Sequence, residues 1–384
     1  MILYAEIVQS MKEASMDRAM NEEIGDPANE EDVPDESVGI VTDARHAQRR
    51  NSHRSDIMAL GQINHRVLAH MPVTKKEQTC TQKHEKVGTE RLYRQLDEMG
   101  VKVSDHAHDR NQSINKFIRE RPPYADGTRT TNSNDTWHAT KAIARKFKRV
   151  SSGPVRSRGV SWHPQLADKG APLKTHFYWC MARCGGDEQV LRDMLLNIVQ
   201  HYQNRHDNCH PESRCRADPN YRPTKLLLTE QRAVELLTNF VRSQDIYKSA
   251  KDYVLCKDTL YVESFNNSCL QYVDKRIVFG DLNYGLRMGL AVLDWNEHVD
   301  REATSRYVRY SVANIRQVQG KRILTAKKYT FVRELLLTFL ARVKAAGNLP
   351  PLPQRQPQPQ REDGALASGS DNSDTDFSAE DEPE

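Results

Sequence analysis

The sequence lacks the features of a membrane or secreted protein. Its 384 residues contain no run that approaches the roughly 18 apolar residues of a bilayer-spanning helix. The N-terminus has no basic segment followed by an apolar stretch and a small-residue cleavage site, so no secretory signal is visible. Cysteine is scarce, and the seven residues are an odd number, which argues against a disulfide framework. We therefore expect a cytosolic or nuclear protein with free thiols or metal-ligating cysteines.

Positive charge is nearly absent from the two ends of the chain. Residues 1–38 hold eleven acids against Lys12 and Arg18, and residues 361–384 hold nine acids against Arg361. The remaining chain holds 53 Lys and Arg against 32 Asp and Glu, a surplus of 21 positive charges, although the whole chain carries only +4. Such a surplus is typical of proteins that bind nucleic acid. A solvated basic surface is the simpler alternative.

Alternating and periodic apolar residues predict the fold of the first half of the chain. Strands are expected over 38–46, 55–62 and 65–73, followed by a helix over 84–100 and a fourth strand over 101–109. A second helix over 111–120 and a strand running into a helix within 133–147 complete the pattern. Three antiparallel strands followed by parallel strands with helical crossovers predict an α/β mixed sheet flanked by helices. This is the strand order of ribonuclease H-like nucleases.

Changes in composition predict the domain boundaries. Residues 1–38 are too acidic to bury much surface, so we expect them to be disordered. Apolar positions at helical spacing predict an all-helical insertion over 151–258, and proline followed by acids and serines predicts a linker and tail over 347–384. The ribonuclease H-like core then occupies 39–150 and 259–346.

Three carboxylates fall where strands and helices of this topology would bring them together. Asp43 is at the end of the first strand and Asp109 is just past the fourth, its expected neighbour in the sheet. Glu263 lies on the helix that follows the insertion. Two strand-end aspartates and a helix glutamate offer the hard oxygen ligands that two Mg²⁺ or Mn²⁺ ions require for phosphoryl transfer. The chain holds 52 acids, so Asp56 or Asp105 could replace one of these aspartates in the same argument.

Cysteine and histidine are concentrated in the predicted insertion. Residues 180–215 contain Cys180, Cys184, Cys209, Cys215, His201, His206 and His210. A tetrahedral Zn²⁺ needs four such nitrogen and sulfur ligands. We favour Cys180, His201, His206 and Cys215 as a structural zinc site, with Cys184 and Cys209 in reserve. The alternative is a set of buried thiols and surface imidazoles, because the spacing matches no standard zinc finger.

Basic and polar residues near the predicted catalytic carboxylates are candidates for contacting DNA. The run ARKFKR at 144–149 could bind a phosphate backbone, although such runs are often solvated faces. Trp137 is expected to pack in the core. The candidate nucleic-acid-binding residues are His138, Lys141, Arg145, Lys146, Lys148, Arg149 and Asn266.

Several stretches of the sequence resemble one known family. The most specific are DTWHATK at 135–141, ESFNN at 263–267 and RMGLAVLDWNE at 287–297, together with GIVTDARH at 39–46. They resemble the ribonuclease H-like, or DDE, catalytic core of an animal cut-and-paste DNA transposase, with Mutator-like or Kolobok-like elements as the nearest comparison. The resemblance implies a metal-binding triad of Asp43, Asp109 and Glu263, with a helical insertion before the glutamate.

The resemblance also implies an activity and its partners. The expected activity is Mg²⁺-dependent cleavage of double-stranded DNA followed by strand transfer, carried out in the nucleus by a homo-oligomer assembled on DNA. Such transposases usually carry a zinc-type DNA-binding domain ahead of the core, whereas an acidic segment of 38 residues precedes the core here. The expected explanations are a truncated copy, a fragment of a longer gene, or a host-recruited derivative that relies on a partner for targeting. The alternatives are a catalytically inactive or host-recruited DNA-binding protein and a stand-alone ribonuclease H-like nuclease.

Overall fold

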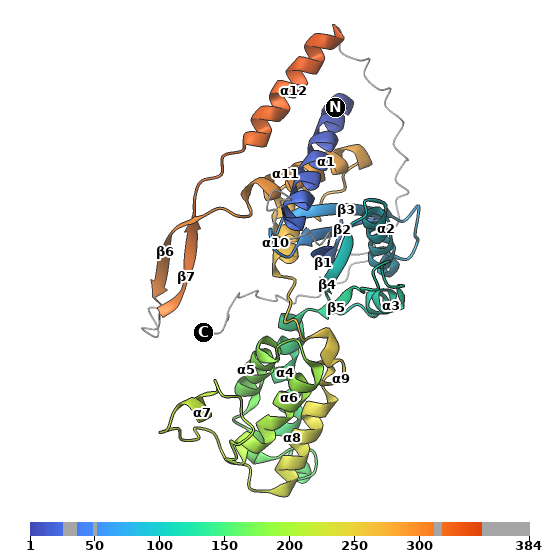
Figure 1. Cartoon of the computed structure of the whole chain (residues 1–384). Helices are drawn as coiled ribbons and strands as arrows, with labels where there is room; N and C mark the ends of the chain where they lie inside the picture. Colours follow the sequence, from blue (N-terminus) through green and yellow to red (C-terminus); the bar gives the residue numbers. More distant parts are fainter. Residues whose placement is uncertain (26–36, 49–51, 311–316, 348–384) are drawn as a thin grey trace, which may run out of the picture.

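The computed structural model describes residues 1–25, 37–48, 52–310 and 317–347 (Figure 1). Its central feature is a five-stranded sheet in the order β3-β2-β1-β4-β5. The strands are β1 (Ser37–His46), β2 (Arg54–Gly61), β3 (Val67–Thr74), β4 (Lys102–His108) and β5 (Thr131–Asn134). β1, β2 and β3 pair antiparallel, whereas β4 is parallel to β1 and β5 to β4. The mixed sheet and the strand order expected from the sequence are confirmed.

Helices cover both faces of the sheet because its strands carry consecutive apolar residues, which point to opposite faces. On one face Ile40 and Ala59 pack against Leu92 of α2 (His84–Glu98), with α3 (Gln112–Glu120) beside it. On the other face Val41 and Met58 pack against α10 (Leu260–Ser268) and α11 (Asp281–His298). Successive side chains of a strand point to opposite faces, so Ile40 and Val41 enter different cores. α10 therefore lies against β1, the strand that carries Asp43, and against β2.

The acidic N-terminal segment contains a helix, so the prediction of disorder over 1–38 is wrong for most of its length. α1 spans Ile2–Ile24, and Ile7 and Val8 are 1% exposed. They pack against α11 and against α12 (Thr330–Ala346). The eleven acids dominate the average composition of this segment, and that average suggested disorder. A helix needs only one apolar face to be buried, and the average does not show such a face. Residues 26–36 and the predicted linker and tail beyond Gly347 lie outside the described residues.

A separate helical unit follows β5 (Figure 1). Its helices are α4 (Thr136–Ser151), α5 (Gly170–Arg183), α6 (Glu188–Tyr202), α7 (Arg214–Ala217), α8 (Gln231–Ser243) and α9 (Asp245–Lys248). Ile143 and Phe147 of α4 belong to the same buried cluster as Phe177 and Leu195. The helical unit therefore begins with α4, ahead of the boundary at residue 151 that composition suggested.

The rest of the described chain consists of short helices and a hairpin. Single 3-10 turns occur at Thr81–Lys83, Val155–Ser157, Pro164–Leu166, Ala250–Asp252 and Cys269–Gln271. β6 (Ala303–Tyr310) and β7 (Gln317–Leu324) form an antiparallel pair that the sequence pattern did not predict. Among the described helices, none has the length and apolar character needed to cross a membrane.

Candidate active site and metal centres

Four side chains with metal-ligating atoms converge where the sheet meets the helical unit. They are Asp109, Asp135, His138 and Glu263, and one ligand atom from each lies within 4.8 Å of those of the others. The Nδ1 atom of His138 lies 3.4–3.6 Å from an oxygen of each of the three carboxylates. Three acids and an imidazole thus surround a single point. We call these four residues the carboxylate cluster.

Asp135 ties the cluster to the backbone of two helices. Its Oδ1 atom accepts a hydrogen bond from the backbone N–H of His138 (2.5 Å), which caps the N-terminus of α4. Its Oδ2 atom accepts from the backbone N–H (2.8 Å) and the hydroxyl (2.5 Å) of Thr259, the residue that precedes α10. Thr259 therefore uses its hydroxyl to bind Asp135 and does not cap α10 with it. One carboxylate fixes the helix that carries His138 and the helix that carries Glu263.

Asp43 lies beside the cluster rather than within it. The parallel register pairs Thr42 with His108, so the next residues, Asp43 and Asp109, are neighbours across β1 and β4. β1 continues to His46, and Asp43 is therefore inside the strand rather than at its end. Its Oδ2 atom accepts a hydrogen bond from the Asn266 side chain (2.7 Å). The structure brings Asp109 and Glu263 together directly and places Asp43 on the adjacent strand.

The acids of the site raise one another's pKa values. Burial raises the pKa of both Asp109 and Glu263, the His138 charge partly offsets this, and the charges of Asp43 and Asp135 raise both pKa values further. Crowded carboxylates of this kind are unfavourable without a compensating cation. Their oxygen donors fit a hard divalent cation such as Mg²⁺ or Mn²⁺. The residues present thus fit the divalent metal that the resemblance to DDE transposases implied.

Glu85, which the sequence reasoning missed, belongs to the same neighbourhood. It lies in the first turn of α2, and its Oε2 atom accepts a hydrogen bond from the Asn111 side chain (2.7 Å). Burial, followed by the charges of Asp43 and Asp109, raises the pKa of Glu85 to about 7. No spacing rule connects residue 85 to Asp109. Only the packing of α2 beside the ends of β1 and β4 could reveal it.

The two other aspartates considered from the sequence are structural. Asp56 is fully buried, and its carboxylate accepts hydrogen bonds from His70 (2.8 Å) and the Tyr284 hydroxyl (2.5 Å). Asp105 is bound by Ser133 and Gln62. Neither belongs to the carboxylate cluster.

A second group of ligands forms in the helical unit. His201, His206, Cys209 and Cys215 each place a ligand atom within 4.8 Å of the others. We call these four residues the His/Cys quartet. The Cys209 Sγ atom lies 3.6 Å from His201 Nδ1 and 3.7 Å from His206 Nδ1.

The predicted zinc ligand Cys180 is not part of the His/Cys quartet. It is fully buried within α5, and its Sγ atom lies 3.3 Å from the His176 Nε2 atom. Cys184 is also buried, with its thiol directed to backbone carbonyls. Cys209 takes the expected place of Cys180, because the turn after α6 folds back toward His201. His210 lies against the Trp179 ring, 5.1 Å between centroids.

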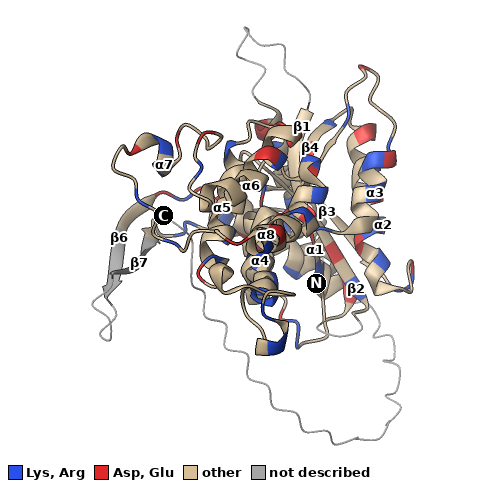
Figure 2. Cartoon of the chain, turned by 90° about the horizontal axis from the view of Figure 1, so that it is seen from below, with Lys and Arg blue, Asp and Glu red and all other residues tan. Residues whose placement is uncertain are grey.

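The candidate DNA-binding residues separate into two groups. Lys141, Arg145, Lys148 and Arg149 are exposed along α4, where Lys and Arg are blue in Figure 2. Lys146 instead forms an ion pair with Asp245 (3.4 Å). His138 lies in the carboxylate cluster, and Asn266 binds Asp43.

Trp137 is 41% exposed, so the expectation that it packs in the core is wrong. The Lys141 ammonium lies 4.4 Å from the centre of its ring. The α4 N-terminus therefore presents an aromatic face and a cation next to the carboxylate cluster.

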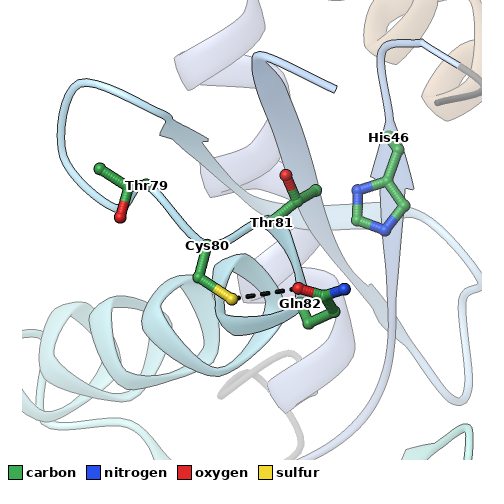
Figure 3. A pocket seen from close by; sticks show the side chains of 5 residues that line it. All are labelled: His46, Thr79, Cys80, Thr81 and Gln82. Atoms are coloured by element: carbon green, nitrogen blue, oxygen red, sulfur yellow. Dashed lines mark hydrogen bonds between the residues drawn. The ribbon is translucent and has the colours of Figure 1, made fainter. Parts of the chain in front are cut away.

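A small hollow opens where β1 ends (Figure 3). His46, three residues beyond Asp43, lies across it from the segment Thr79–Gln82 that leads into α2. The Nδ1 atom of His46 is 2.7 Å from the Ser55 hydroxyl, which is 2.8 Å from the His84 Nδ1 atom. These contacts hold the ends of β1 and β2 against the start of α2.

The acids of this site come from β1 (Asp43), from the residue that follows the parallel strand β4 (Asp109) and from the helix α10 (Glu263). Residues 70–215 match the family model of the Mutator-like transposases. This segment contains Asp109, Asp135, His138 and the His/Cys quartet. The central part of the chain thus resembles a Mutator-like transposase core, which indicates a transposase-type function on DNA. No curated protein matches the chain, and no solved structure matches it.

Proposed function

We propose that the chain cleaves DNA and transfers the resulting 3′ end to a target by divalent-metal-dependent phosphoryl transfer. The observation that carries the proposal is the convergence of Asp109 and Glu263 with Asp43 on the neighbouring strand. The match of residues 70–215 to Mutator-like transposases supports the same activity. Action on chromosomal DNA as a nuclear homo-oligomer is part of this proposal.

The residues of the site have distinct parts in this chemistry. Asp43, Asp109 and Glu263 would hold Mg²⁺, with Asp135 and His138 adjoining. A bound divalent pair supplies activation of the attacking oxygen and stabilisation of the leaving oxygen. Asp135 holds the helix ends that carry His138 and Glu263. The His138 imidazole can accept or donate a proton beside the reacting phosphate.

The exposed cations of α4 give the DNA backbone a place next to this chemistry. Lys141, Arg145, Lys148 and Arg149 lie on the helix whose N-terminus bears His138. Phosphate contacts position a duplex without reading its sequence. We therefore propose that α4 directs a phosphodiester toward the carboxylate cluster.

We further propose that the His/Cys quartet binds one structural Zn²⁺. Two imidazoles and two thiols are the usual ligands of a closed tetrahedral site, which leaves no position for a catalytic water. The ligands come from the C-terminal end of α6 and the segment up to α7, whose few apolar residues provide little other stabilisation. Zinc would therefore fold this segment rather than take part in DNA cleavage.

The test of the proposed activity is the Glu263→Gln variant, which keeps the side-chain shape and removes its charge. We expect loss of cleavage of transposon-end DNA in Mg²⁺, with nearly unchanged DNA affinity in a filter-binding assay. Glu188→Gln, on an exposed turn of α6, is the control and should cleave as the wild type does. Equal cleavage by Glu263→Gln and wild type would refute the active-site assignment. DNA binding without any cleavage by the wild type would favour a transposase-derived binding protein.

A further inference from the structure

Glu85 is connected to Asp109 through one side chain. Its Oε2 atom accepts a hydrogen bond from Asn111 Nδ2 (2.7 Å). The Asn111 Oδ1 atom in turn accepts from the backbone N–H of Ser113 (2.9 Å) and caps α3. The backbone N–H of Asn111 donates to the carbonyl of Asp109. Glu85 therefore fixes the turn on which the Asp109 carboxylate is carried.

The second oxygen of Glu85 has no such partner. Its Oε1 atom is buried without a hydrogen-bond partner among the described residues. No Lys, Arg or His in the described ranges forms an ion pair with Glu85. The charges of Asp43 and Asp109 act on Glu85 and raise its pKa. This carboxylate therefore has a buried oxygen without a hydrogen bond and is repelled by two like charges, which is an unfavourable environment.

The hydrogen bond to Asn111 does not require this charge. The amide oxygen of a glutamine could accept the same bond without repelling Asp43 and Asp109. The negative charge of Glu85 becomes favourable when a divalent cation occupies the site between the neighbouring acids, because the cation reverses the local electrostatics.

We propose that Glu85 is a positioning residue of the metal site, which holds the Asp109 turn through Asn111 and whose charge strengthens divalent-cation binding by the neighbouring carboxylates. This inference rests on the proposed function, because it assumes that Asp43, Asp109 and Glu263 bind the cation. It adds a fourth acid from α2, a helix outside the predicted triad. Glu85 acts through these residues and does not itself contact the reacting phosphate.

The test compares the full chain with Glu85→Gln and with the control Glu90→Gln. Glu90 lies on the same helix and pairs only with Lys86 at the surface (3.3 Å). Calorimetric titration of Mn²⁺ into zinc-loaded protein at pH 7.5 measures the affinity, and thermal unfolding without added Mn²⁺ measures stability. Loss of a residue that supports metal ligands typically weakens binding 10- to 100-fold. We expect at least a tenfold loss for Glu85→Gln and none for Glu90→Gln.

The stability measurement separates this role from a structural one. Glu85→Gln should unfold at the wild-type temperature or above it in the absence of Mn²⁺, because it removes charge repulsion. Unchanged Mn²⁺ affinity in Glu85→Gln would overturn the inference, and so would a lower unfolding temperature without Mn²⁺. Asp109→Asn distinguishes these results from failure of the proposed function. If wild type and Asp109→Asn both fail to bind Mn²⁺, with DNA present as well, the metal site itself is refuted.

Discussion

Asp135 uses both of its carboxylate oxygens to cap helices. The three hydrogen bonds that it accepts reach α4 through His138 and α10 through Thr259. Most capping residues satisfy the backbone of a single helix. At the scale of one residue, Asp135 therefore joins the two ends of the helical unit at the carboxylate cluster.

Removing this double cap should cost more than removing a single one. A lost helix cap costs about 0.5–2 kcal/mol, so we expect Asp135→Ala to lower the free energy of unfolding by about 2–3 kcal/mol. Denaturant-induced unfolding measures the difference. Asp187→Ala, which removes the cap of α6 alone, should cost about 1 kcal/mol. Equal losses in the two variants would contradict the double-cap role.

The charge of Glu85 predicts how stability depends on pH. Its pKa is raised in the folded chain to about 7 from the ordinary 4.5, so the folded state binds more protons between these values. Stability must then fall as pH rises from about 4.5 to 7 and remain reduced above that range, by about 3 kcal/mol from this group. In thermal unfolding without added divalent metal, the stability of Glu85→Gln relative to wild type should increase as the pH rises across this range. A constant difference between the two proteins would disprove the assignment.

Sequence and structure agree where a residue's role depends on local pattern. The short apolar run that contains Ile40 and Val41 was enough to predict β1, and the strand order was enough to pair Asp43 with Asp109. Asp135 looks like an ordinary helix cap in the sequence, and Glu85 like an exposed acid. Their parts in the site depend on contacts with residues 124 and 26 positions away, which no local pattern records.

At the scale of an element, the segment that leads from α6 to α7 carries most of the His/Cys quartet. The sequence indicated zinc chemistry there but could not decide which thiols meet. Cys180 and Cys209 are equally suitable zinc ligands as residue types. Only the turn after α6 brings Cys209 close to His201. A buried residue within a helix, such as Cys180 on α5, cannot move toward ligands in a loop without disrupting the packing around it.

Replacing these two cysteines should therefore have different effects. We expect Cys209→Ser to lose the bound zinc and to become sensitive to proteolysis between α6 and α7. Cys180→Ser should retain one zinc per chain, because its thiol lies outside the quartet. Elemental analysis and limited proteolysis measure both outcomes. Zinc loss in Cys180→Ser with retention in Cys209→Ser would restore the ligand set expected from the sequence.

At the scale of the whole molecule, the surplus of 21 positive charges over residues 39–360 should govern association with DNA. Each phosphate contact that is lost reduces the slope of log affinity against log salt by about 1. The Arg145→Ala, Lys148→Ala double variant should therefore lower this slope by about 2 in fluorescence anisotropy titrations. Lys116→Ala, which removes a surface pair with Glu120 on α3, should leave it unchanged. A double variant with the wild-type slope would place the DNA elsewhere.

The two ends of the helical unit meet at the carboxylate cluster, where the Thr136 N–H donates to the Lys257 carbonyl (3.0 Å). During synthesis the ribosome releases Asp43, Asp109 and Asp135 long before Glu263. The last acid reaches its partners only after the whole helical unit has emerged and closed on itself. A nascent chain, or a product of premature termination within that unit, therefore lacks Glu263 and has an incomplete carboxylate cluster. Under the proposed function, such incomplete chains would have no DNA-cleaving activity.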